Sequence, residues 1–212
     1  MDISDIKEIY GTRTPGVIGR HRFYAVLVPF CLQSDTLSLL YEVRSGSVSQ
    51  PGEICFPGGH MEEGETPEEC AVRETCEELG IGRNAVEVIG QGDTLYGNGN
   101  FTLYTFIGEI DTGALNTAEP DDSEVGEIFF VPLDRLLEET PEHYGEKMRA
   151  EIDTHFPYDK VGIGRDYPWR TPSNDIPVYD IDGRVIWGLT GRITENVIET
   201  LKKIEMRASN DK

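Results

Sequence analysis

Residues 59–81 read GHMEEGETPEECAVRETCEELGI, and this stretch decides most of what can be said about the fold. Thr66, followed by a proline, is placed to cap a helix, and Glu69 three residues later completes a capping box. Gly80 is suited to the left-handed conformation in which helices commonly end. The stretch therefore predicts a loop, a helix over 67–79 and a second loop.

Three glutamates crowd the C-terminal half of this helix. With 3.6 residues per turn, Glu74, Glu77 and Glu78 lie on one side and the apolar residues on the other. Like charges at this spacing destabilise an isolated helix, and the helix dipole disfavours anions near the C-terminus. Carboxylate oxygens without His or thiolate ligands suit Mg²⁺ or Mn²⁺. The pattern indicates a cation site that binds a phosphate ester; a solvated acidic face is the alternative.

The whole stretch resembles the Nudix box, G-x5-E-x7-R-E-U-x-E-E-x-G-U, where U is an aliphatic residue. One position departs: Thr75 stands where an aliphatic residue is usual. The matching positions are Gly59, Glu65, Arg73, Glu74, Glu77, Glu78, Gly80 and Ile81. The resemblance implies an α/β fold, the Nudix α/β/α sandwich with a mixed sheet and the box in a loop–helix–loop. It also implies hydrolysis of a nucleoside diphosphate linked to another group.

The resemblance also implies roles for individual residues. Glu77 and Glu78 are expected as metal ligands, and Glu74 as a further ligand or as the base that orients the attacking water. A backbone carbonyl of Gly58 or Gly59 is expected to complete the coordination, in a tight turn that glycine permits.

An ion pair and one further glutamate complete the expected site. Arg73 and Glu65 are expected to form an ion pair that fixes the loop against the helix. Nudix enzymes often use a further glutamate from a distant loop. Glu124 is the first candidate for it and Glu127 the second, with a solvated acidic loop as the alternative.

Segments on both sides of the box are similar to the coenzyme A pyrophosphatase family. Residues 39–59 resemble its L-L-T-x-R-S element followed by G-x3-F-P-G-G, and 185–193 resemble its WGLTA-type element. This resemblance implies hydrolysis of CoA or its thioesters to 3′,5′-ADP and 4′-phosphopantetheine, with Arg44 and Ser45 as substrate contacts. The alternatives are another nucleoside diphosphate hydrolase, acting on ADP-ribose, NADH or a dinucleotide, and a non-catalytic Nudix binding module.

Two departures from that family concern the substrate. Residues 41–43 read Tyr-Glu-Val where Leu-Thr-x is usual, and Ser49 replaces a basic residue that is suited to read the 3′-phosphate of CoA. Arg165, Trp169 and Arg170 of a later insertion are candidate substitutes. Trp187, within the WGLTA-type element, is expected in the core or as a helix-docking residue.

Hydrophobic patterns outside the box predict strands mixed with a few helices, hence an α+β or α/β domain with a mixed sheet. One domain over 1–212 is expected, with a core at about 22–140, an irregular insertion at about 141–176 and a C-terminal helix at about 189–206. The expected elements are a helix at 3–10, strands at 22–30, 36–44, 53–56, 86–96, 101–110, 128–131 and 178–181, a turn at 97–100, an acidic loop at 111–126 and a helix at 133–139.

Composition limits the partners. The chain has 212 residues and a formal net charge of −20, which disfavours nucleic acids and anionic membranes. The longest apolar run, 24–32, is too short to span a bilayer, and no export signal is visible, so a cytoplasmic location is expected. The four cysteines lack zinc-ligand spacing and are expected to be reduced thiols. The expected partner is a small nucleoside diphosphate, and the apolar stripe of the C-terminal helix leaves a homodimer open.

Overall fold

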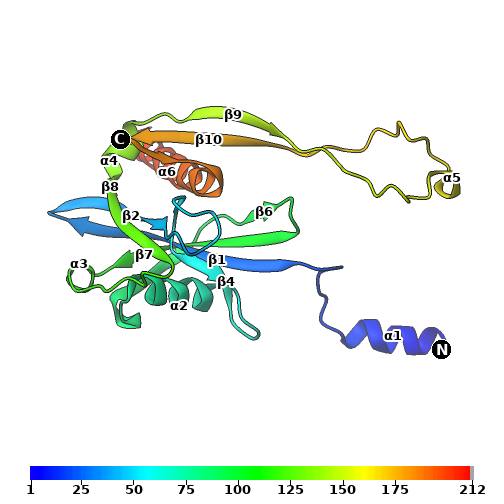
Figure 1. Cartoon of the computed structure of the whole chain (residues 1–212). Coiled ribbons are helices and arrows are strands. Elements are labelled where there is room, and N and C mark those ends of the chain that lie inside the picture. Colours follow the sequence, from blue (N-terminus) through cyan, green and yellow to red (C-terminus); the bar gives the residue numbers. More distant parts are fainter. Residues whose placement is uncertain (211–212) are drawn as a thin grey trace.

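The structure is a computed structural model, and it describes residues 1–210. Its main sheet contains β1 (Arg22–Gln33), β2 (Thr36–Arg44), β3 (Ile54–Cys55), β4 (Gly58–His60), β5 (Val86–Gln91), β6 (Leu95–Gly97), β7 (Phe101–Ile110) and β8 (Val125–Pro132). β1 runs parallel to β7 and antiparallel to β2 and β4 (Figure 1). β3 and β8 pair with β2, and β5 and β6 pair with β7. The sheet is therefore mixed, as the sequence predicted.

Both faces of β1 are covered. Ala25 and Leu27 belong to a hydrophobic cluster shared with α2 (Pro67–Leu79), whereas Val28 and Phe30 belong to a second cluster on the opposite face. Successive side chains of a strand point to opposite faces, so this strand needs apolar residues at almost every position. The apolar run at 24–32 is thus part of a central strand between two layers.

The helix α2 confirms the local predictions. It covers the residues expected for it; Thr66 is its N-cap, and the capping box with Glu69 is present. Gly80 ends it in the left-handed conformation, with φ of 64°. Thr75 and Leu79 are fully buried against the sheet, so threonine at the aliphatic position does pack on the apolar side. The 3₁₀ turn η1 (Arg83–Ala85) then leads into β5.

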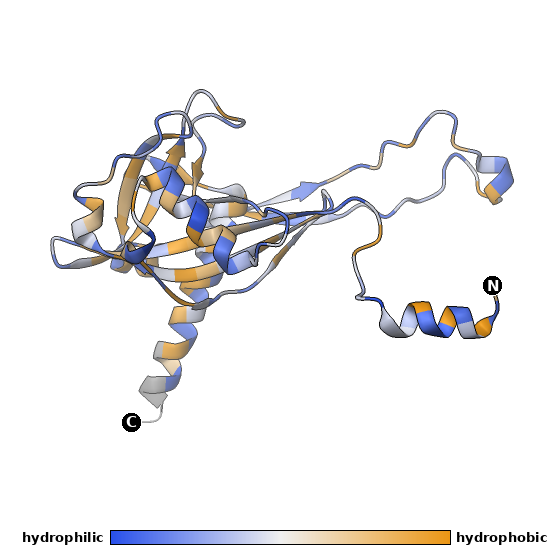
Figure 2. Cartoon of the chain, turned by 90° about the horizontal axis from the view of Figure 1, so that it is seen from below, coloured by the Kyte–Doolittle hydropathy of each residue, from blue (hydrophilic) through white to orange (hydrophobic). Residues whose placement is uncertain are grey.

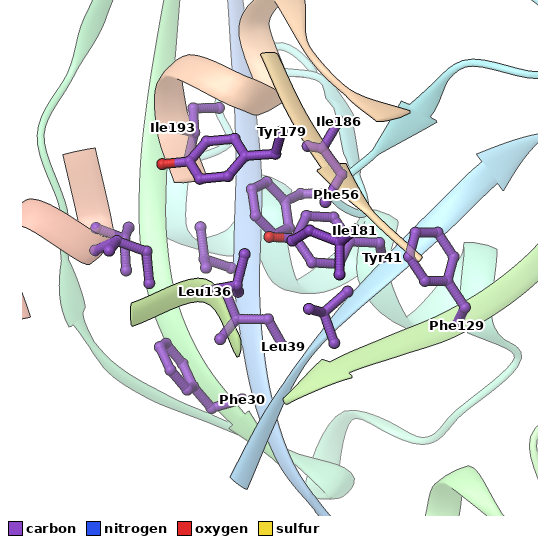
Figure 3. Packing of buried hydrophobic residues seen from close by; sticks show 14 of the residues in the cluster. Phe30, Leu39, Tyr41, Phe56, Phe129, Leu136, Tyr179, Ile181, Ile186 and Ile193 are labelled. Atoms are coloured by element: carbon purple, nitrogen blue, oxygen red, sulfur yellow. The ribbon is translucent and has the colours of Figure 1, made fainter. Parts of the chain in front are cut away.

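A second layer covers the opposite face. It contains α4 (Leu133–Glu138), α6 (Gly188–Asn210) and an antiparallel sheet of β9 (Glu142–Lys147), β10 (Ser173–Ile181) and β11 (Arg184–Ile186). Tyr41 lies at the centre of this core and stacks on Phe56 and Phe129, with ring centroids 4.7 and 5.5 Å away (Figure 3). Its hydroxyl lies 3.0 Å from Oγ1 of Thr194 on α6. The molecule is an α/β/α arrangement.

The prediction of an irregular insertion at 141–176 is wrong in part. β9 and β10 form a long antiparallel ladder, with Ser173 opposite Lys147, and only the tip beyond this pair is irregular apart from α5 (Tyr158–Val161). All residues of β9 are exposed. Because none of them needs to be apolar, the sequence carries no alternating pattern that would mark a strand.

Smaller differences concern the other connections. The expected acidic loop at 111–126 contains the short helix α3 (Thr112–Leu115), and residues 92–94 separate β5 from β6 within the expected strand 86–96. The apolar stripe of α6 is buried at Ile193 and Val197 but exposed at Ile204.

The helix expected at 3–10 is present as α1 (Ile3–Thr12). None of its residues is buried, and it lies apart from the sheet (Figure 1). Its apolar and polar residues alternate around the helix, and the hairpin of β9 and β10 also projects from the body (Figure 2). Within residues 1–210, no helix has the length and apolar character needed to cross a membrane.

Candidate active site

A cavity of about 730 Å³ lies where α2, β1, β4 and the start of α6 meet. Glu74 and Glu78 of α2 line it, and Glu124 from the loop before β8 lines it as well. Arg22 and Arg44 also contribute to its walls. The cavity therefore brings together carboxylates and guanidinium groups from segments that are far apart in the sequence.

The two glycines before the helix allow α2 to approach the sheet. Gly58 has φ of 148°, and a Cβ atom there would overlap the backbone of Ala25 and Val26 on β1. A Cβ atom on Gly59 would overlap the carboxyl group of Glu74. These residues form the strand β4 rather than the expected turn, so the glycines are needed for close packing beside another strand and beside a site carboxylate.

Gly58 also holds Glu78 in place. Its N–H donates to Oε2 of Glu78 at 2.7 Å, and the Glu78 side chain is buried. Burial raises the pKa of Glu78 to about 8; this hydrogen bond opposes the shift, while repulsion from Glu74 and Glu124 adds to it. The carbonyl ligand expected at Gly58 or Gly59 stays a prediction.

The predicted ion pair between Arg73 and Glu65 is present. Arg73 donates from Nε and Nη2 to the two carboxylate oxygens of Glu65 at 2.8 and 3.1 Å. The hydrogen bond from Arg73 holds the pKa of Glu65 at about 2. Nη1 of Arg73 also lies 2.9 Å from Glu74 and 3.0 Å from Glu77. One guanidinium therefore joins the loop before the helix to two box carboxylates.

The three box glutamates do not point to the same place. Glu74 and Glu78 face the cavity, but Glu77 is 62% exposed, pairs with Arg73 and does not line the cavity. Residues 77 and 78 differ by about 100° around the helix, which separates their side chains. The metal-ligand role expected for Glu77 stays a prediction that requires its side chain to move.

The two candidates for the glutamate from a distant loop lie in different places. Glu124 lies on the cavity, whereas Glu127 is on the surface and pairs with Arg184 at 2.6 Å. The backbone N–H of Ser45 donates to the carbonyl of Glu124 at 2.8 Å, and its hydroxyl donates to the carbonyl of Ser123 at 2.6 Å. Ser45 does not line the cavity; it secures the loop that carries Glu124.

Arg44 lines the cavity beside Ser49, the residue that replaces the basic residue of the family pattern. Its Nε donates to the carbonyl of Ser49 at 2.9 Å, and both residues line the cavity. The candidate substitutes Arg165, Trp169 and Arg170 lie near the tip of the hairpin, and none of them lines this cavity (Figure 1). Within one chain, the prediction that the insertion supplies the missing basic residue is wrong.

The rest of the wall was not foreseen. Arg22 and Phe101 stand opposite each other at the start of the parallel strands β1 and β7, and Tyr24 also lines the cavity. Trp187 was expected in the core or as a helix-docking residue. It is not in the core, since it is 45% exposed, and it borders both this cavity and a smaller one of about 420 Å³. Parallel strands that are far apart in the sequence leave no local sequence pattern that shows which residues pair, so Arg22 and Phe101 could not be matched from sequence. Trp187, in contrast, belongs to the WGLTA-type element and was singled out by it.

The chemistry of the donor set fits Mg²⁺ or Mn²⁺. Glu74, Glu78 and Glu124 offer only oxygen donors on one cavity, and burial, as its largest cause, also raises the pKa of Glu74. A divalent cation would add positive charge beside these three carboxylates. In the part of the chain that the structure describes, no three His, Cys, Asp or Glu side chains already converge closely enough to hold a metal ion. A cation would therefore compete with Arg73 for Glu74 and with the Gly58 N–H for Glu78.

Comparison with known proteins gives consistent matches. A family model described as the NUDIX domain matches residues 21–151. The mouse protein "Peroxisomal coenzyme A diphosphatase NUDT7" is 35% identical over 135 residues, which are 63% of this chain and only 56% of that protein. The mouse "Mitochondrial coenzyme A diphosphatase NUDT8" is 28% identical over 198 residues, 92% of this chain and 85% of that protein. The solved structure of the Nudix hydrolase RenU from M. smegmatis is 25% identical with a TM-score of 0.46, covering 56% of this chain and 74% of that one.

Proposed function

Because the chain belongs to the Nudix family, we propose that it is a divalent-cation-dependent diphosphatase that cleaves coenzyme A or its thioesters. The products would be 3′,5′-ADP and 4′-phosphopantetheine or its acyl derivative. The observation that carries the proposal is the cavity on which Glu74, Glu78 and Glu124 lie together with Arg44. Carboxylates for a cation and a guanidinium for a phosphate are the two charges that diphosphate hydrolysis needs at one site.

Each residue has a distinct task in this proposal. Glu78 and one of Glu74 and Glu124 would hold the cation, and Arg44 would bind a phosphate oxygen. Arg73 holds Glu74 at the cavity wall and ties the helix to Glu65. When bound, the cation would neutralise the diphosphate and lower the pKa of water. Whichever of Glu74 and Glu124 does not bind the cation would orient the attacking water, since both carboxylates line the cavity.

The choice of CoA rests on two supports. Both mouse relatives carry the name of coenzyme A diphosphatases. The cavity also has an apolar side, to which Tyr24, Phe101, Leu103 and Trp187 contribute. Such a wall suits a nucleobase or the pantetheine arm, because ligand cavities combine apolar walls with a few placed polar groups.

The direct experiment is a hydrolysis assay with product identification. Purified protein would be incubated with CoA and with acetyl-CoA in Mg²⁺ or in Mn²⁺, with EDTA and the Glu78→Gln variant as controls. We expect both substrates to release 3′,5′-ADP, identified by its mass, and this release to depend on the metal ion. If CoA stays intact while ADP-ribose, NADH or a dinucleotide is cleaved, the diphosphatase proposal holds and the CoA proposal fails. Inertness towards the whole panel would favour a non-catalytic binding module.

We further propose that residues 1–212 form a single domain, that the protein forms a homodimer and that it is located in the cytoplasm. Size-exclusion chromatography with light scattering would test the oligomeric state, and limited proteolysis would test whether the chain behaves as one unit.

A further inference from the structure

A fourth glutamate lies behind the wall of the cavity. Glu42 lies near the C-terminal end of β2 and is 1% exposed. Leu40 packs in the cluster beneath α2, and Arg44 lines the cavity. Residues two apart in a strand share a face, so Glu42 lies on the α2 side of the sheet between these two neighbours. Its strand partner Cys55 also lines the cavity, which places Glu42 directly behind that wall.

Glu42 has almost no polar partner. Its Oε2 accepts only a long contact from Sγ of Cys55 at 4.0 Å, and Oε1 has no hydrogen-bond partner at all. Within residues 1–210, Glu42 belongs to no ion pair. Burial, followed by repulsion from Glu78, raises the pKa of Glu42 well above its ordinary value. A buried carboxyl group without hydrogen-bond partners lowers the stability of the fold, because the loss of its hydration is not compensated.

The fold does not account for this residue. The paired strand residue on the other side of Glu42 is Ile128, which packs in the same hydrophobic cluster as Leu40. An apolar or small polar side chain would therefore suit the position better than a carboxylate. A natural sequence that keeps an unsatisfied buried polar group commonly does so at a functional site.

We propose that Glu42 is a positioning carboxylate of the cation site, placed behind Glu78, whose unsatisfied oxygen is compensated when the cation binds. This inference rests on the proposed function, because that function requires the cation. In its ionised form, which a nearby cation favours, Glu42 would add negative charge to the side of the cavity that Glu74, Glu78 and Glu124 already make acidic. It would strengthen cation binding and would destabilise the protein in the absence of the cation.

Two readouts without substrate test the proposal. Mn²⁺ affinity would be measured by calorimetry, and thermal unfolding would be followed with EDTA and with saturating Mn²⁺. We expect Glu42→Gln to weaken Mn²⁺ binding by about tenfold, as is typical when a supporting group of a metal site is lost. We also expect the variant to unfold at the same or a higher temperature than the wild type in EDTA, and to gain less than the wild type from Mn²⁺.

Glu109→Gln is the matched control, since Glu109 lies on β7 of the same sheet but is exposed and away from the cavity. It should change neither readout. If Glu42→Gln binds Mn²⁺ like the wild type, Glu42 is only a buried acid and the proposal is overturned. Glu42→Thr repeats the test with a smaller side chain in case the first variant does not fold. A wild-type protein that binds no Mn²⁺ would overturn both this inference and the metal-dependent function. Mn²⁺ binding that Glu42→Gln weakens, without any cleavage of CoA, would support this inference and overturn the CoA proposal alone.

Discussion

The loop and helix over 58–80 and the hairpin over 142–181 are held in place by different forces. The first segment is capped at both helix ends, buries Thr75 and Leu79, and is joined to its own loop through Arg73. The outer part of the second has backbone pairing, exposed side-chain hydrogen bonds and aromatic contacts at its tip, but β9 is exposed along its whole length and α5 buries no residue. Side chains are positioned accurately only where packing and hydrogen bonds determine them together, so the chemistry belongs to the first segment.

The largest expected effect comes from removing the charge of Glu78. Glu78→Gln should lower kcat/KM for CoA by at least about a thousandfold, because a cation ligand on the reacting diphosphate is lost. The unfolding temperature should stay the same or rise, since a buried carboxyl group is removed. Initial rates and thermal unfolding monitored by circular dichroism measure the two quantities. Near-normal activity would remove Glu78 from the cation site.

A gain of function should follow from a basic residue at position 49. Ser49→Arg places a guanidinium in the cavity beside Arg44, where the hairpin supplies none. We expect kcat/KM for CoA to rise by about tenfold relative to dephospho-CoA, the value of one charge-assisted hydrogen bond to the 3′-phosphate. Both substrates would be assayed side by side. An equal change for the two would show that position 49 does not face the 3′-phosphate.

The ion pair of Glu65 should matter for stability as well as for activity. Glu65→Gln removes the charge from a bidentate, partly buried pair and should lower the free energy of unfolding by about 1–2 kcal/mol in urea titrations at pH 7. Since the pKa of Glu65 falls to about 2 in the folded protein, this contribution is present above pH 4.5 and is lost as the pH falls towards 2. Glu63→Gln, an exposed residue of the same loop, is the control. Equal stabilities of the two variants would contradict the structural role of the pair.

Much of the first segment could be predicted from sequence because its determinants are local. The caps of α2, the burial of Thr75 and the pair between Arg73 and Glu65 all follow from spacing along one stretch of chain. The facing of Glu77 away from the cavity did not follow, because the box pattern records residue types and not the angle from which the sheet approaches the helix.

The parts that could not be predicted depend on register between distant strands. Arg22 meets Phe101 only because β1 and β7 pair in parallel, and Glu42 lies behind the cavity wall only because β2 pairs with β3. The strand β9 could not be recognised for a different reason: its residues are exposed, so no periodic pattern was required of them. The sequence therefore predicted the carboxylates of the site better than the other residues that line its cavity.

The base of the hairpin should respond to pH through His143. Nδ1 of this residue lies 2.7 Å from Asp175 on β10, and Nε2 lies 3.0 Å from Glu195 on α6. The Asp175 contact, the largest cause, raises the pKa of His143 above 6.5. Its stabilising effect is therefore complete below pH 6.5 and is lost as the pH rises through the folded-state pKa. The unfolding temperature of the wild type should be a few degrees above that of His143→Gln at pH 5.5, and the two temperatures should become equal by about pH 9. A difference that stays constant with pH would exclude a role for protonation of His143.

The smallest effect is expected from removing the tip of the hairpin, and this deletion tests the comparison most directly. Lys147 and Ser173 face each other across the ladder, so residues 148–172 can be replaced by Asn-Gly, a two-residue turn that suits paired strands. The tip contributes no residue to the cavity, and we expect kcat/KM for CoA to stay within about twofold and the urea midpoint to change little. Light scattering on both proteins would reveal any change in oligomeric state. A large loss of activity together with a loss of dimer would show that the tip of one copy serves the cavity of another, because within a single chain the two regions do not meet.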